Sequence, residues 1–110
     1  MTNLEKVRGK LGAEELFCAV AEEASELAQA ALKLRRAMNG KNPTPVSREE
    51  ALANFKEEVR DVELALLALG IYSEEDEVGP EQEEHHKRKT ARWLARLEEE
   101  ERRGRETEIG

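Results

Sequence analysis

The chain has 110 residues and a formal net charge of −7, with 39% charged and 38% apolar residues. Ordinary globular domains hold about 25% charged and 45–50% apolar residues, so we expect a single domain over residues 1–110 with a thin core. The acidic balance argues against stable nucleic-acid binding. No apolar run could span a membrane or act as a leader, and one cysteine allows no internal disulfide, so the predicted location is the cytoplasm.

Helix-forming residues dominate the chain, and it contains only three prolines. Residues 1–11 are treated as an N-terminal segment. The first helix is predicted over residues 13–38, because the pair Asn39-Gly40 is a typical C-cap and the Pro-containing loop after it cannot continue a helix.

The second helix is predicted to begin at Ser47, where Ser47 and Glu50 have the spacing of a capping box, and to end at Leu69 before Gly70. A polar stretch follows, and Pro80 suits the first turn of a third helix that runs to about residue 100. Residues 101–110 are expected to be a frayed tail.

Apolar residues at helical spacing define the faces that we expect to pack. On the first helix they are Leu16, Val20, Leu27, Ala31 and Leu34, and on the second they are Leu52, Phe55, Val59, Val62, Leu66 and Leu69. Residues 64–69 are apolar on nearly all sides, which indicates that two neighbours cover them. The third helix offers only Trp93, Leu94 and Leu97. We therefore predict an all-α bundle of three main helices, completed to a four-helix type by homo-oligomerisation.

Carboxylates interrupt this apolar pattern. Glu23 falls within the stripe of the first helix and Glu26 lies one turn on; Glu58 and Asp61 repeat the spacing beside the stripe of the second helix. A carboxylate that loses its hydration must be paired, protonated or bound to metal. Either pair alone would suit an ordinary solvated face, but both pairs at core-flanking positions favour a metal site. Oxygen ligands without convergent His or Cys favour Mg²⁺, with Mn²⁺ as a substitute.

At this point the sequence resembles a known family. The segments EEASEL, residues 22–27, and EEVRDV, residues 57–62, are similar to the EExxE and ExxD motifs of the MazG-like all-α nucleoside triphosphate pyrophosphohydrolases. The resemblance covers roughly residues 11–97, with the loop NGKNPTPVS and the later segment KTARW. Either motif alone is weak evidence, whereas the ordered pair on two long helices is more specific.

The resemblance implies a set of roles. Metal ligands would be Glu23, Glu26, Glu58 and Asp61. Glu22, less engaged with metal, would orient a water or take its proton. The family works as dimers or tetramers and cleaves (d)NTPs between the α and β phosphates, giving a monophosphate and pyrophosphate. A housekeeping role in the nucleotide pool would follow.

The predicted third helix carries a row of cations at spacings of four, three and four residues, namely His85, Lys89, Arg92 and Arg96. By the resemblance, Lys89 and Arg92 would contact the phosphates. The alternative is that these cations only pair with nearby glutamates, which contributes little at a surface. Trp93 could stack on a base, but its apolar neighbours favour a core position.

The base that the site would recognise stays open at this stage. Plausible base-facing residues are Phe17, Asn54, Phe55 and Tyr72, and the sequence does not choose among them.

Three other functions are alternatives to this one. A di-iron carboxylate bundle needs two Glu-x-x-His pairs, and only Glu83 with His86 has that spacing. A non-catalytic acidic helical interaction module would leave Glu23 unexplained. A phosphoribosyl-ATP pyrophosphohydrolase would share the metal site within the same superfamily.

Overall fold

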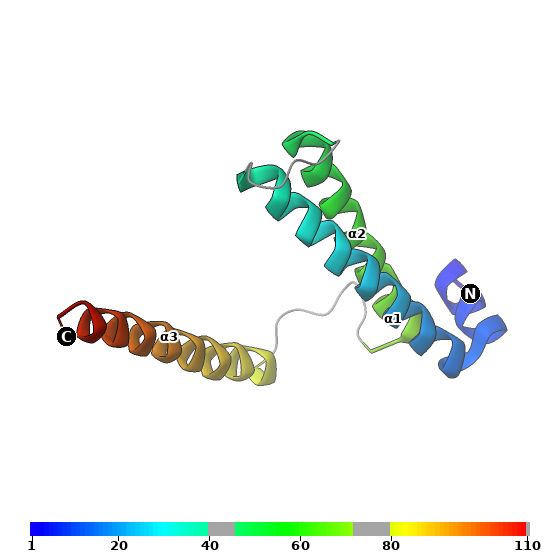
Figure 1. Ribbon diagram of the computed structural model, residues 1–110. Helices are drawn as coiled ribbons and strands as arrows, with labels where there is room; N and C mark the ends of the chain where they lie inside the picture. Colours follow the sequence, from blue (N-terminus) through cyan, green and yellow to red (C-terminus); the bar gives the residue numbers. More distant parts are fainter. Residues whose placement is uncertain (40–45, 72–79, 110) are drawn as a thin grey trace. The chain divides into compact units, whose positions relative to one another are not determined.

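A computed structural model describes residues 1–39, 46–71 and 80–109. The described residues form three α-helices and no strand, which confirms the all-α prediction. The helices are α1 (Asn3–Asn39), α2 (Arg48–Leu69) and α3 (Pro80–Ile109), labelled in Figure 1. The chain divides into two compact units, Met1–Glu74 with α1 and α2, and Glu75–Gly110 with α3. The single-domain assignment stays a prediction.

Helix α1 begins earlier than the sequence predicts and is bent near its start. Gly12 has φ 79° and ψ 166°, outside helical geometry, and divides α1 into a short helical arm of residues 3–11 and the long helix that follows. Arg8 ties this arm to the end of α2: its Nε donates to the carbonyl of Ala68 at 2.8 Å and its Nη2 to that of Leu67 at 3.1 Å. The N-terminal segment is therefore part of the packed unit.

The bend at Gly12 can be tested by comparing Gly12 with Gly9, a glycine within the arm. A Cβ on either Gly9 or Gly12 would meet nothing within 4 Å, so only their backbones distinguish them. We expect Gly12→Ala to destabilise the chain by about 1–3 kcal/mol, because its backbone region is essentially restricted to glycine. Gly9→Ala, in regular helix, should instead stabilise it by about 0.5–1 kcal/mol. Urea unfolding of both variants measures this, and equal effects would contradict the hinge.

Local capping chemistry fixes the ends of α2 as the sequence predicts. The Ser47 hydroxyl accepts a hydrogen bond from the Glu50 N–H at 3.1 Å. At the other end Gly70 is left-handed, with φ 86° and ψ 20°, and its N–H is shared between the carbonyls of Leu66 and Leu67. Helix α1 ends at Asn39, one residue beyond the prediction. The predictions for Gly40 and for the loops over 40–45 and 72–79 lie outside the described residues.

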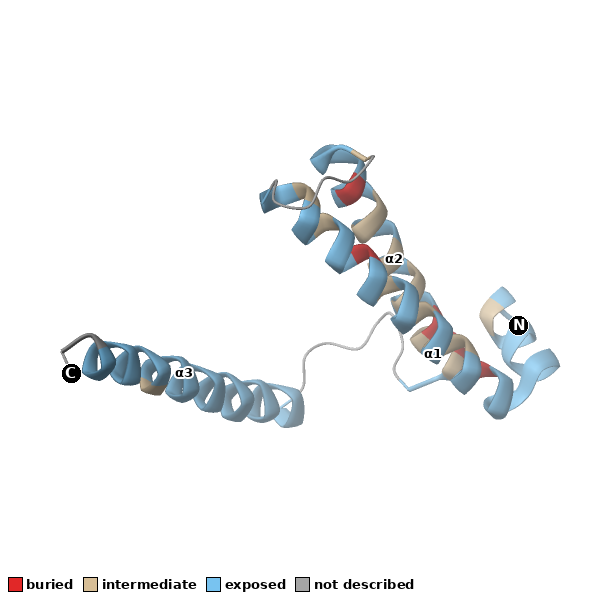
Figure 2. Cartoon of the chain, in the orientation of Figure 1, coloured by how far each residue is buried: buried red, intermediate tan, exposed pale blue. Residues whose placement is uncertain are grey.

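Small residues make the contact between α1 and α2, which lie side by side (Figure 1). The buried residues are Leu16, Ala30, Ala51, Ala65 and Ala68, and Figure 2 shows them as red bands along this pair. Two predicted stripe residues, Ala31 and Leu52, are exposed, so the expected faces are wrong at these positions. The buried alanines let the two backbones approach closely, and larger residues such as Val59 and Leu66 are partly buried beside them.

Helix α3 extends beyond its predicted end, so the expectation of a frayed tail is wrong. Arg102 pairs with Glu99 and Glu106, and Arg103 pairs with Glu99, at spacings of three and four residues. These neighbours on one helix face support the last turns. None of the side chains described in α3 is buried. Over the described ranges no helix is both long and apolar enough to cross a membrane.

Candidate metal centre

Three carboxylates from the two packed helices meet in one place. Glu23 and Glu26 lie one turn apart on α1, and Glu58 reaches the same place from α2. Each of the three side chains has one carboxylate oxygen that lies within 4.8 Å of such an oxygen on the other two. The motif spacing on α1 and the close packing of α1 on α2 together produce this cluster, and it contains three of the four predicted ligands.

In two of these carboxylates, one oxygen has lost water without gaining a hydrogen-bond partner. Glu23 and Glu58 are partly buried, and the Oε2 atom of each is buried without a hydrogen-bond partner within the described residues. Exposed acidic clusters are common without any ion, but buried polar atoms are nearly always hydrogen-bonded. A cation that takes oxygen ligands fits these two atoms, because it would replace the hydration that each has lost.

Burial and neighbouring negative charge disfavour the ionised forms of Glu23 and Glu58. Desolvation is the largest cause that raises the pKa of Glu23 above its ordinary value, and the carboxylates of Glu26 and Asp61 raise it further. The pKa of Glu58 is raised by desolvation first and then by Glu26, Asp61 and Glu23. Negative charge is thus concentrated at this site without a compensating cation from these side chains.

These raised pKa values predict an unusual pH dependence for the metal-free chain. Below the ordinary value of 4.5, Glu23 is protonated in both folded and unfolded chains and carries no penalty. As pH rises from there through the raised folded pKa, the unfolded chain releases the proton more readily, so folding stability is lost. Glu23→Gln cannot ionise and is spared this loss.

The measurement is the melting temperature of parent and Glu23→Gln from pH 4 to pH 7 in EDTA. We expect the two curves to meet at the acid end and the variant to become the more stable as pH rises. Taking the difference between the chains removes titrations that both share, including that of Glu99, whose pKa its Arg102 hydrogen bond lowers. A difference that stays constant across this range would show that Glu23 ionises normally.

The other two predicted acidic residues lie beside the cluster. Asp61 on α2 is partly buried and close enough to raise the pKa of both Glu23 and Glu58, but it is not one of the three converging groups. Glu22 is exposed and borders a surface hollow with Glu26. Glu22 therefore has access to solvent beside the cluster, which suits the predicted role in handling a proton.

An apolar pocket of about 350 Å³ adjoins the cluster. Glu23 and Asp61 form its acidic edge, and its remaining walls are Leu4, Val7 and Leu11 of the arm with Leu16, Ala19, Leu64, Ala65 and Ala68. No site predicted from the sequence includes the arm. The helical spacing of its three apolar residues, at intervals of three and four, was the available indication. The arm reaches the 64–69 segment through the Arg8 bonds to the carbonyls of Leu67 and Ala68, while Leu64 stays 53% accessible.

Of the predicted base-facing residues, the three that the structure describes do not line this pocket. Phe17 is 60% exposed, Asn54 and Phe55 are partly buried elsewhere on the unit, and Tyr72 lies outside the described residues. Trp93 is 67% exposed, so the expectation that it is a core residue is wrong.

The predicted phosphate contacts, Lys89 and Arg92, belong to α3 in the second unit, and both are exposed. Their joint use with the carboxylates stays a prediction.

The cluster offers oxygen donors alone, a set suited to a hard divalent cation such as Mg²⁺ or Mn²⁺. Such an ion, bound at the mouth of an apolar pocket, could hold the charged part of a substrate while the pocket takes an apolar part. Comparisons with protein-family models, curated proteins and solved structures find no match for this chain, so the chemistry of these side chains carries the functional argument.

Proposed function

We propose that the chain is a Mg²⁺-dependent nucleoside triphosphate pyrophosphohydrolase of the MazG-like type, acting on cytoplasmic (d)NTPs. The observation that carries the proposal is the convergence of Glu23, Glu26 and Glu58 with two buried oxygens that lack partners. The ordered pair of acidic motifs supports it from the sequence. A cation-binding role explains why these helices keep carboxylates where apolar residues would pack at lower cost.

Glu23, Glu26 and Glu58 would hold the cation, with Asp61 beside them as a fourth ligand. When bound, the ion would supply positive charge that attracts phosphate oxygens and makes a nearby water more acidic. Glu22, which is exposed, would take the proton from that water as it attacks the α-phosphorus. The bond from the α-phosphorus to its bridging oxygen then breaks, and pyrophosphate leaves.

The apolar pocket beside Glu23 and Asp61 is the place that we propose for the base. It opens directly beside Glu23 and Asp61, two of the carboxylates that would hold the cation, and its walls are aliphatic, which suits the face of a planar ring. These walls provide shape and apolar contact but few polar groups, so we expect modest discrimination among bases.

Assembly is part of the same proposal. The two-helix unit exposes large apolar side chains, with Leu64 53%, Leu32 60% and Phe17 60% accessible. Two such units packed together would complete a four-helix bundle and cover this surface in a dimer or tetramer. Light scattering of the full chain measures this state, and a stable monomer at micromolar concentration would contradict it.

The decisive experiment is incubation with a panel of (d)NTPs and phosphoribosyl-ATP, with Mg²⁺ or with EDTA. Products should be analysed for monophosphate, diphosphate, pyrophosphate and phosphate. Monophosphate with pyrophosphate, formed only with Mg²⁺, would support the proposal. Turnover confined to phosphoribosyl-ATP would favour the alternative enzyme of the same superfamily. No turnover, and no change of melting temperature with Mg²⁺, would favour a non-catalytic interaction module.

The cations of α3 give a separate prediction. We expect Lys89→Ala and Arg92→Ala each to lower kcat/KM by roughly tenfold or more while the helical circular dichroism is unchanged, because both side chains are exposed and would act only on phosphate. Arg105→Ala is the matched control, since Arg105 is an exposed arginine of the same helix outside the predicted row. Equal kinetics for all four chains would show that the row is only a solvated face.

A further inference from the structure

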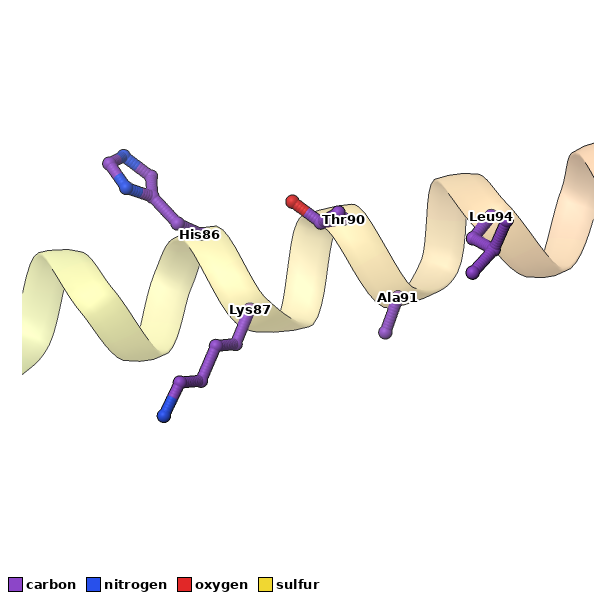
Figure 3. Close-up of a pocket in the computed structure, with 5 residues that line it drawn as sticks. All are labelled: His86, Lys87, Thr90, Ala91 and Leu94. Carbon is purple, nitrogen blue, oxygen red and sulfur yellow. The ribbon is translucent and has the colours of Figure 1, made fainter.

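Helix α3 carries an apolar seam that the proposed activity does not use. Its exposed large apolar residues are Trp93 at 67%, Leu94 at 54% and Leu97 at 46% accessibility. A shallow hollow lies along the helix beside these residues. Figure 3 shows the side chains that line it, which are His86, Lys87, Thr90, Ala91 and Leu94. An exposed helix of 30 residues gains most of its stability from packing, so this seam needs a cover.

The centre of the seam, Leu94 and Leu97, has the spacing of a coiled coil, and polar residues continue that spacing on both sides. Residues Lys87, Thr90, Leu94, Leu97 and Glu101 follow one another at intervals of three, four, three and four, the spacing that keeps one face against a partner helix. Trp93 lies beside the seam and widens it. The natural occupant of such a face is therefore another helix with the same 3.5-residue repeat.

The distribution of charge along α3 indicates which helix could be this partner. From His85 to Arg96 the chain carries five Lys or Arg and no Asp or Glu, and four consecutive glutamates follow from Glu98 to Glu101. A second α3 in parallel register would set Lys87 against Lys87 and Glu101 against Glu101. An antiparallel α3 reverses this, because it brings the basic half of each helix against the acidic half of the other.

We propose that α3 pairs antiparallel with α3 of a second copy of this chain. With Leu94 of one copy opposite Leu97 of the other, Thr90 faces Glu101 and Lys87 faces Gly104. Glu84 of one copy and Arg105 of the other then lie on the same side of the interface, and their charges are opposite. The interface has a small apolar centre with complementary charge at both ends, so its strength depends on salt.

This pairing leaves the proposed phosphate contacts free. At 100° per residue, Lys89 and Arg92 lie on the side of α3 away from Leu94 and Leu97. The pairing does not depend on the proposed activity, and either can be wrong without the other.

Disulfide mapping tests the orientation in the full chain. Exposed Cys18 is first replaced by Ser, and Thr90→Cys and Glu101→Cys are then introduced together. Within one helix these positions are about 16 Å apart, because each residue rises about 1.5 Å, so they cannot join in the same chain. After mild oxidation we expect peptides linked 90 to 101 between two chains. Links from 90 to 90 and from 101 to 101 would mean parallel pairing, and no links would mean no pairing; both results overturn the proposal.

A matched cysteine pair controls for random collision. Arg92→Cys with Glu99→Cys has the same midpoint along α3 but lies on the opposite side of the helix. We expect little cross-linking there, and linkage as extensive as at 90 and 101 would overturn the proposal.

Sedimentation equilibrium of the full chain gives the second measurement. Leu94→Lys places a charge in the seam and should weaken self-association roughly tenfold or more, whereas Ala95→Lys, about 100° around the helix, should leave it nearly unchanged. Association of the parent should also weaken between about 0.05 M and about 1 M NaCl, as the Debye length shrinks. The proposal fails if the two lysine variants behave alike.

Discussion

Replacing Glu58 by Gln should abolish most turnover while leaving the metal-free chain at least as stable as the parent. Gln keeps the shape of the side chain but removes one charge from the three-carboxylate cluster. Without metal, the uncharged Gln side chain escapes the repulsion from Glu26, Asp61 and Glu23, which together with desolvation raises the pKa of Glu58. The melting temperature in EDTA should therefore be unchanged or higher.

With Mg²⁺ the order of the two chains should reverse. The parent gains stability by mass action, about 2.7 kcal/mol at a hundred times its Kd, and the variant gains less because it has lost a ligand. Hydrolysis should fall by roughly a hundredfold or more, since the ion offsets charge on the phosphate. Glu57→Gln is the matched control, because Glu57 is the preceding residue, exposed and outside the cluster.

The test compares the parent with each variant. Each comparison needs four melting curves, one for each chain with Mg²⁺ and one with EDTA, and a pyrophosphate assay. If Glu58→Gln lowers both melting temperatures equally and leaves Mg²⁺-dependent turnover intact, Glu58 is an ordinary surface residue and the metal-site proposal is wrong.

Replacing Glu23 by Leu should separate folding from function even more strongly. Glu23 lies at the edge of an apolar pocket beside Leu16 and Ala19, and its Oε2 is buried without a partner. Leu is of similar size and needs no hydration, so the metal-free chain should melt several degrees above the parent. The same change removes a ligand from the cluster, so the Mg²⁺-induced rise in melting temperature and the turnover should both be lost.

The control for this substitution is Glu15→Leu at an exposed position of α1. It adds the same apolar side chain without removing a buried oxygen and should change neither the Mg²⁺ response nor turnover. A Glu23→Leu chain that melts below the parent in EDTA would show that the carboxylate has a structural partner in solution.

Local chemistry made part of this fold predictable. Ser47 and Gly70 mark the ends of α2 because each satisfies backbone groups within a few residues. The buried face was harder to predict, since Ala30 and Ala31 are chemically identical and only the close approach of α2 selects Ala30. The arm was missed because Gly12 bends the helix without ending it, and bends depend on tertiary contacts such as those of Arg8.

The sequence could predict the part of the candidate site that lies on a single helix. The interval between Glu23 and Glu26 places both on one side of α1 before any packing is known. Which residues of α2 meet them depends on how the two helices are aligned, and the structure brings Glu58 into the cluster while Asp61 stays beside it. Long-range partners such as Lys89 belong to another unit and cannot be placed from spacing.

The contact between Arg8 and Gly70 has a consequence for how this sequence can vary. A Cβ at position 70 would lie 3.1 Å from the Arg8 Cζ, in addition to the strain of a left-handed backbone. Asn tolerates that backbone best among non-glycine residues, so in Gly70→Asn the contact with Arg8 adds to a reduced backbone strain. A shorter residue at position 8 removes this obstacle, although it also gives up the bonds to the carbonyls of α2. The two positions are therefore epistatic, and related sequences should change them together.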